Sequence, residues 1–147
     1  NGIPVIMATD NGDGAILDVE RFDQDRKRPL FHGLTGKWDM DKLSNLDYAQ
    51  WLNLATKIVD PCYLTDGMQK SLPAIGKTLA GVPQLGTASA IAGAAVALAV
   101  RQMANKKDLP SGRYLFGLEE RLIPGYSSSI SKKQRWRRAE ELKKILQ

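Results

Sequence analysis

The sequence has few of the side chains that build disulfides and zinc sites, since it contains one cysteine and one histidine among 147 residues. A lone cysteine excludes a disulfide within the chain, and Cys62 with His32 is too small a set for a Cys/His-rich zinc cluster. Cys62 follows Asp60-Pro61 at the expected end of a helix, and no second histidine is available to activate its thiol. We therefore expect Cys62 to be a small, semi-buried residue.

Common catalytic and nucleotide-binding motifs are also missing. The sequence contains no GxxxxGK[ST], GxGxxG, HExxH, CxxC or GxSxG pattern. Chemistry would have to come from scattered carboxylates such as Asp10, Asp13 and Glu20, which we expect to be solvated because carboxylates in turns usually are. The sequence therefore predicts a non-enzymatic protein with no catalytic residue, no metal ligand and no cofactor-binding residue.

Charge is unevenly distributed along the chain. Residues 1–66 hold seven Lys/Arg and eleven Asp/Glu, a net charge of −4, whereas residues 67–147 hold fourteen Lys/Arg and five Asp/Glu, a net charge of +9. A basic half joined to an acidic half favours either a negatively charged partner at one end or a head-to-tail contact between copies.

The N-terminal part predicts a β-hairpin and a connector. Two short apolar runs, 3–8 and 15–19, flank the segment 9–14, whose Asn-Gly and Asp-Gly pairs supply the positive φ angles of a tight turn. The same turn, Asp10-Gly14, also has a spacing similar to that of a calcium loop, but Thr9 stands at the first ligand position and Pro4 prevents an entering helix. We therefore predict a tight turn rather than a calcium-binding loop. Residues 20–37 are polar and interrupted by proline and glycine, so we expect an extended connector in which His32 is hydrogen-bonded or faces solvent.

The first helix is predicted at 44–59. Ser44 with Asp47 resembles a capping box, apolar residues then recur at helical spacing, and Asp60-Pro61 ends the helix. A second, short helix is predicted within 66–80, interrupted by proline and glycine.

The segment 78–100 contains no charged residue. Its length would span a bilayer, but its hydropathy is borderline and Pro83-Gln84 shortens the uninterrupted part. Ser89, Gly93 and Ala97 place small side chains four residues apart, which lets two helices approach closely. Burial in a protein assembly and insertion into a membrane both remain open at this point.

The C-terminal helix is predicted at 131–147, with Ser131 and Gln134 as its capping box. One face of this helix is apolar, and the other is basic. A cluster of cations around a tryptophan suits non-specific contact with phosphates and one stacked base, or another acidic partner. It also suits an anionic membrane surface, or a solvated basic face on a helix whose apolar side packs on a neighbouring subunit. The expected binding residues are Lys132, Lys133, Arg135, Trp136, Arg137 and Arg138.

Together these features predict a mainly α fold with a small N-terminal β-hairpin, in an extended, assembly-dependent chain whose principal helices lie near 44–59, 87–107 and 131–147. The expected units are 1–37 (hairpin and connector), 38–109 (helical core) and 110–147 (linker and basic helix). The chain begins at Asn1 without methionine and ends in an apolar-Gln sequence, which resembles the sites left by viral polyprotein proteases; an artificial boundary or a removed targeting peptide explains these ends equally well.

The predicted function is that of a non-enzymatic structural or assembly protein. Its features look like those of a minor, proteolytically processed component of a virus particle, whose central helix packs closely or meets a membrane and whose basic tail contacts nucleic acid. A single-span accessory subunit of a membrane complex is the first alternative, and a soluble, non-specific nucleic-acid-binding module is the second. The expected partners are other protein subunits, with nucleic acid at the C-terminal helix and a membrane at 78–100, in a virion or a membrane-associated complex.

Overall fold

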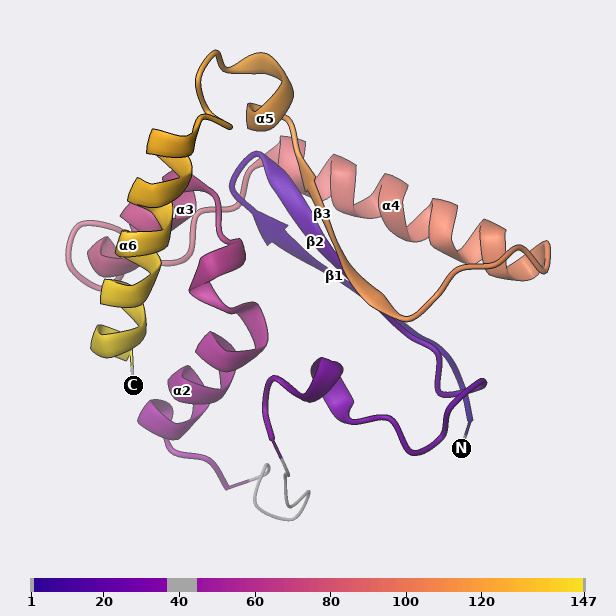
Figure 1. The fold of residues 1–147 in the computed structure, drawn as a ribbon. Coiled ribbons are helices and arrows are strands. Elements are labelled where there is room, and N and C mark those ends of the chain that lie inside the picture. The colour runs from indigo at the N-terminus through magenta and orange to yellow at the C-terminus, as the bar shows by residue number, and fades with distance from the viewer. Residues whose placement is uncertain (1, 37–44, 147) are drawn as a thin grey trace.

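The fold is built around a three-stranded antiparallel sheet (Figure 1). The computed structural model describes residues 2–36 and 45–146. Strands β1 (Val5–Asn11) and β2 (Gly14–Glu20) form a hairpin, and β3 (Gly112–Gly117) pairs with the other edge of β2. The strand order β1-β2-β3 makes β2 the central strand, and every residue of β2 is buried.

The predicted fold class is wrong, because the chain is α+β rather than mainly α. The predicted hairpin is present, with Asn11 facing Gly14 across a two-residue turn in which Gly12 has a φ of 61°. The hairpin is not an appendage, however. β3 joins it from the far end of the sequence, and the resulting sheet is the centre around which the helices pack.

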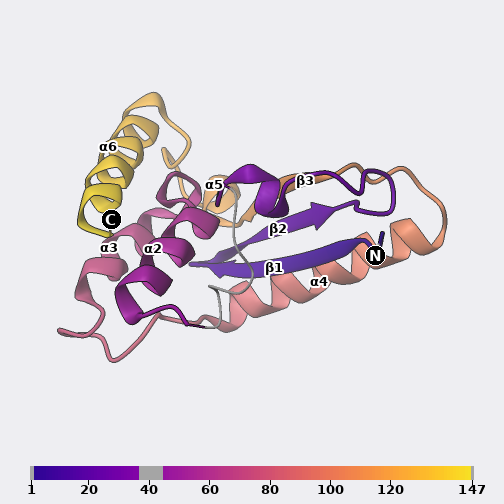
Figure 2. The ribbon, with the colours of Figure 1, turned by 90° about the horizontal axis from the view of Figure 1, so that it is seen from below.

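Helix α4 (Gly86–Ala104) lies along one face of the sheet (Figure 2). Alanines recur at helical spacing on its inner side, so the helix axis can approach the strands closely. Two of them, Ala95 and Ala99, form the apolar core with Leu17 and Val19 of β2. The buried alanines of this helix are Ala88, Ala92, Ala95 and Ala99.

The remaining long helices gather at one end of the sheet (Figure 1). Helix α6 (Ser129–Leu146) packs against α2 (Tyr48–Val59), α3 (Asp66–Ser71) and the 3-10 turn 61–63 between them. A short helix, α5 (Glu119–Leu122), follows β3. The connector after β2 includes a 3-10 helix, Leu30–Gly33.

The N-terminal caps of α2 and α6 differ from those predicted, whereas α2 ends at Val59 before Asp60-Pro61 as predicted. The capping box of α2 is formed by Asp47 and Gln50, whereas the predicted cap Ser44 lies outside the described residues. At the start of α6, the hydroxyl of Ser128 accepts a hydrogen bond from the backbone N–H of Ser131, so the helix begins before the predicted cap. A side-chain oxygen that accepts from an N-terminal N–H satisfies a group with no partner inside the helix.

Candidate functional site

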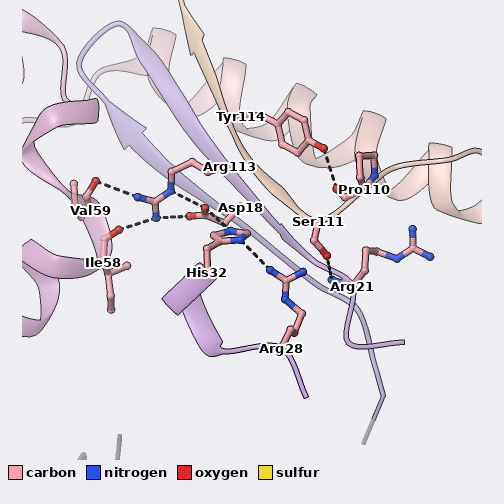
Figure 3. Close-up of polar contacts among 10 residues, drawn as sticks. All are labelled: Asp18, Arg21, Arg28, His32, Ile58, Val59, Pro110, Ser111, Arg113 and Tyr114. Atoms are coloured by element: carbon pink, nitrogen blue, oxygen red, sulfur yellow. Dashed lines mark hydrogen bonds and ion pairs between the residues drawn. The ribbon is translucent and has the colours of Figure 1, made fainter. Parts of the chain in front are cut away.

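The sheet face opposite α4 carries a buried polar cluster centred on Asp18 (Figure 3). Asp18 of β2 lies directly across the strand pair from Arg113 of β3. The guanidinium of Arg113 donates to both carboxylate oxygens, Nε to Oδ1 at 2.7 Å and Nη2 to Oδ2 at 2.9 Å. Both side chains are almost completely buried, and this paired, bidentate geometry offsets the cost of removing two charges from water.

Arg113 also connects the sheet to helix α2. Its Nη2 donates to the carbonyl oxygen of Ile58 at 2.7 Å, and its Nη1 donates to that of Val59 at 3.4 Å. These carbonyls belong to the last turn of α2. Carbonyl groups in that turn have no hydrogen-bond donor within the helix, and they form the negative end of the helix dipole. A single side chain therefore joins β2, β3 and the end of α2.

His32 completes the cluster from the connector. Its Nε2 lies 3.1 Å from Oδ1 of Asp18, and its Nδ1 lies 2.9 Å from Nη2 of Arg28. Arginine can only donate, so Nδ1 must be the acceptor, and Nε2 carries the proton that is donated to Asp18. The cluster thus selects one tautomer of the imidazole, and the prediction of a hydrogen-bonded histidine is confirmed.

The backbone at this histidine is strained. Phe31 and His32 have φ angles of 49° and 54°, in the left-handed region that non-glycine residues rarely adopt. Each residue in this backbone conformation lowers the stability of the fold by on the order of 1–3 kcal/mol. The conformation persists only where the surrounding structure holds it in place. Here the bond from His32 to Asp18 fixes the strained turn against the sheet.

The outer face of α4 is exposed and carries no charge before Arg101. Gly93 and Ala97 lie on this face, and a Cβ added to Gly93 would meet no atom within 4 Å. Ser89 is exposed too, but its hydroxyl donates to Asp10 at 3.2 Å, and the hydroxyl of Thr87 donates to Asp13 at 2.7 Å. The sheet-facing residues of the helix are therefore its four buried alanines and Val96. Of the three predicted packing residues, Gly93 and Ala97 face outward, and Ser89 is exposed but bonded to β1.

Helix α4 is also long and apolar enough to cross a membrane, and no other helix in the described ranges meets that test. Core helices of soluble proteins pass the same test, although they are mostly buried. Only 22% of the most apolar 18-residue window of α4 is buried in this structure.

Two of the predicted binding residues of α6 are bonded to other parts of the chain. Arg135 stacks on the ring of Tyr126 with 4.1 Å between the guanidinium carbon and the ring centroid, and donates to the Tyr126 carbonyl. Burial raises the pKa of Tyr126 to about 12, so this phenol stays protonated. Arg138 pairs with Asp66, which also pairs with Lys70. Although partial burial acts in the opposite direction, these two cations hold the pKa of Asp66 below its usual value.

The other predicted binding residues form the exposed side of α6. Lys132, Lys133 and Arg137 are exposed. Among the described residues, their side chains have no ion-pair partner. Trp136 is 60% exposed among them. The apolar face predicted for this helix from Ile130, Trp136, Ala139, Leu142 and Ile145 is only partly buried. Ala139 and Leu142 are buried, and the other three are exposed.

Cys62 is exposed rather than semi-buried. Lys143 donates to its sulfur over 3.2 Å, yet partial desolvation dominates and raises the pKa of the thiol. The hydrogen bond to Cys62 and the nearby carboxylate of Asp60 raise the pKa of Lys143. A protonated thiol is a poor nucleophile.

The described residues contain no group of three or more His, Cys, Asp or Glu side chains that could hold a metal ion. At the turn with calcium-loop spacing, the carboxylates of Asp10 and Asp13 instead accept hydrogen bonds from α4. The Asp18 cluster was not predicted. Its signal in the sequence is a charged residue within the otherwise apolar run 15–19, at a strand position whose neighbours are buried.

No protein-family model matches the chain, and no solved structure matches it. The uncharacterized protein MT1398 of Mycobacterium tuberculosis is similar to it, with 39% identity over 112 residues. The match covers 76% of this chain and 15% of that protein, so the chain spans only a small part of its relative's length.

Proposed function

We propose that this chain is a non-enzymatic assembly module that associates with a second copy of itself through the outer face of α4. The observation that carries the proposal is the exposure of a charge-free helix face of small and apolar residues, with Leu98 and Val100 respectively 42% and 51% exposed. Apolar surface of this kind usually marks an interaction site, and the open space at Gly93 allows another helix to come close.

The charges at the two ends of α4 favour an antiparallel pair of identical helices. Asp10 and Asp13 lie beside the first turns of α4, where they accept hydrogen bonds from Ser89 and Thr87, while Arg101 lies in the last turn. An antiparallel crossing centred on Gly93 would place Arg101 of each copy near the carboxylates of the other. Such a contact uses the same patch on both copies, as a two-fold symmetric dimer requires.

Gly93→Leu should abolish this association without unfolding the chain. The leucine side chain enters open space in the monomer but occupies the position where two helices cross. Leucine also has a higher helix propensity than glycine by roughly 0.8 kcal/mol, so the monomer should be at least as stable as wild type. Sedimentation equilibrium should show a dimer for wild type and a monomer for the variant, and thermal denaturation should report the stability.

The matched control is Gly67→Leu, which adds the same side chain at an exposed helical glycine of α3 with no atom within 4 Å of its Cβ position. This variant should remain dimeric. A wild-type chain that is monomeric at high concentration, or a Gly93→Leu variant that still dimerises, would rule out this interface. Monomeric wild type that floats with lipid vesicles would instead favour the membrane-inserted alternative.

Contact with nucleic acid through α6 is a second candidate function. It rests on Lys132, Lys133 and Arg137, three exposed cations close to the exposed indole of Trp136. Basic residues around an aromatic side chain can neutralise phosphates and stack on a base without reading sequence. Two roles predicted for this chain stay predictions: a component of a virus particle and a single-span accessory subunit of a membrane complex.

Neutralising the three exposed cations with glutamine should weaken binding to duplex DNA and flatten its salt dependence. Each phosphate contact contributes about 0.9 to the slope of log affinity against log salt, so the slope should fall by up to about three. Fluorescence anisotropy between low and moderate salt measures this slope. As a control, Arg138→Gln should leave the slope unchanged and lower the stability of the fold, because Arg138 forms an ion pair with Asp66. Equal effects of both variants would contradict a specific role for the exposed face.

A further inference from the structure

A second feature of the sheet face opposite α4 is a cavity of about 120 Å³ beside the Asp18 cluster. Its floor consists of two cross-strand pairs of the hairpin, Val5 with Glu20 and Met7 with Asp18. The connector covers it with three apolar side chains, Phe22, Leu30 and Phe31. The volume is many times the roughly 10–15 Å³ that one water needs, so the cavity can hold a small molecule.

Glu20 is the unusual residue of this cavity. It is only 5% exposed, and its Oε1 is buried without any hydrogen-bond partner. Burying a carboxylate without a partner is strongly unfavourable, and proteins normally pair such a group. Five of the other six cavity residues, Val5, Met7, Phe22, Leu30 and Phe31, have no side-chain donor that could satisfy it.

Comparison with Asp18 shows what Glu20 lacks. The two carboxylates lie two residues apart on the same face of β2, yet Asp18 accepts two bonds from Arg113 and one from His32. The cation in the connector, Arg28, is not paired with Glu20. Its Nη2 is bonded to His32, its guanidinium carbon lies 5.6 Å from the ring centroid of Phe22, and its Nε is also buried without a partner. The cavity therefore has a buried carboxylate at its floor, and among residues 2–36 and 45–146 no cation is paired with it.

We propose that this cavity binds a small organic cation, a primary ammonium group on a short alkyl chain. The ammonium would donate to the Glu20 carboxylate once a rotation of that side chain turns the buried Oε1 toward the cavity, and the alkyl chain would lie against Val5, Met7 and Leu30. A cation is favoured over a neutral donor for two reasons. It neutralises the buried carboxylate, and aromatic rings such as that of Phe31 attract positive charge. The strained backbone at Phe31 fits a binding site, because such strain concentrates where ligands are held.

The test is a titration of the isotope-labelled chain with n-butylammonium, followed by the backbone amide signals in two-dimensional NMR. Shifts should concentrate on β1, on the end of β2 and on the connector around Phe31, and should saturate. Neutral n-butanol and anionic butyrate, which have similar apolar chains, should bind at least about tenfold more weakly. Glu20→Gln, which preserves the shape of the side chain, should weaken n-butylammonium binding by about 10–100-fold, the effect of a charge-assisted hydrogen bond.

Two further measurements keep the test decisive. Without ligand, Glu20→Gln should raise the midpoint of thermal unfolding, because it removes an unpaired buried charge. Glu141→Gln, at an exposed carboxylate of α6, should change neither binding nor stability. If n-butanol binds as tightly as n-butylammonium, if the shifts fall outside the cavity, or if Glu20→Gln binds normally or unfolds at a lower temperature, the proposal is wrong.

Discussion

Arg113→Met should lower the free energy of unfolding by about 3–5 kcal/mol, the usual cost of removing one partner of a buried ion pair. Methionine fills much of the space of the arginine stem, but it leaves Asp18 with His32 as its remaining side-chain partner. It also removes the bonds to the last carbonyls of α2. Urea denaturation followed by circular dichroism measures the change.

A double-mutant cycle separates charge from packing in this experiment. The variant with both Asp18→Leu and Arg113→Met removes both charges of this pair, so neither is left without its partner, and it should be more stable than Arg113→Met alone. Lys70→Met is the exposed comparison, since its pair with Asp66 lies at the surface, and it should cost no more than about 1 kcal/mol. A cost for Arg113→Met as small as that of Lys70→Met would show that the cluster does not support the fold.

Gly14→Ala should be the most disruptive single-methyl change in the sheet. A Cβ at this position would overlap the carbonyl oxygen of Phe116 and lie 3.1 Å from the Cα of Gly117. The contacted atoms belong to the backbone of β3, so they cannot move aside without breaking the pairing of β2 with β3. We expect a loss of about 1–3 kcal/mol or more, with amide hydrogen exchange accelerated first in β3.

Gly67→Ala provides the opposite result in the same assay. This glycine lies in α3 with open space around its Cβ position, so alanine should stabilise the chain by up to about 1 kcal/mol through helix propensity. If Gly14→Ala behaves like Gly67→Ala, the close approach of β3 to the hairpin turn does not occur in solution.

Local patterns in the sequence located several elements well. The predicted hairpin, the long helix near 87–107 and the C-terminal helix correspond to β1 with β2, to α4 and to α6. Each of these depends on signals close together in the chain, namely a Gly-containing turn, an uninterrupted helical run and helical periodicity with a nearby polar cap. The inner alanine face of α4 could not be distinguished from its outer face, because both consist of small or apolar residues.

The sheet as a whole could not be predicted, because β3 is identified by its partner rather than by its own composition. Residues 112–117 are a short aromatic run between two glycines, and nothing within that run says that it pairs with β2. For the same reason Glu20 was expected to be a solvated carboxylate near a turn. It lies at the end of the central strand, and only the tertiary structure shows that the connector covers it.

In the basic helix α6, too, the sequence indicated one feature and could not indicate another. Its charge density was evident, but the sequence could not show that Arg135 and Arg138 bind Tyr126 and Asp66 from earlier parts of the chain. An arginine that reaches a carboxylate 72 residues away in sequence has the same local pattern as one that faces solvent.

The partner that neutralises Asp18 also determines when the chain can fold during its own synthesis. Arg113 lies 95 residues after Asp18, so a ribosome releases the hairpin, α2 and α4 before the matching cation and the third strand exist outside the exit tunnel. Until then, burial would leave the carboxylate of Asp18 without its ion-pair partner. We therefore expect that face of the hairpin to stay hydrated. β3 should therefore pair with β2 late, after β3 has emerged. This pairing should be slow, because closing the long loop between the two strands costs conformational entropy.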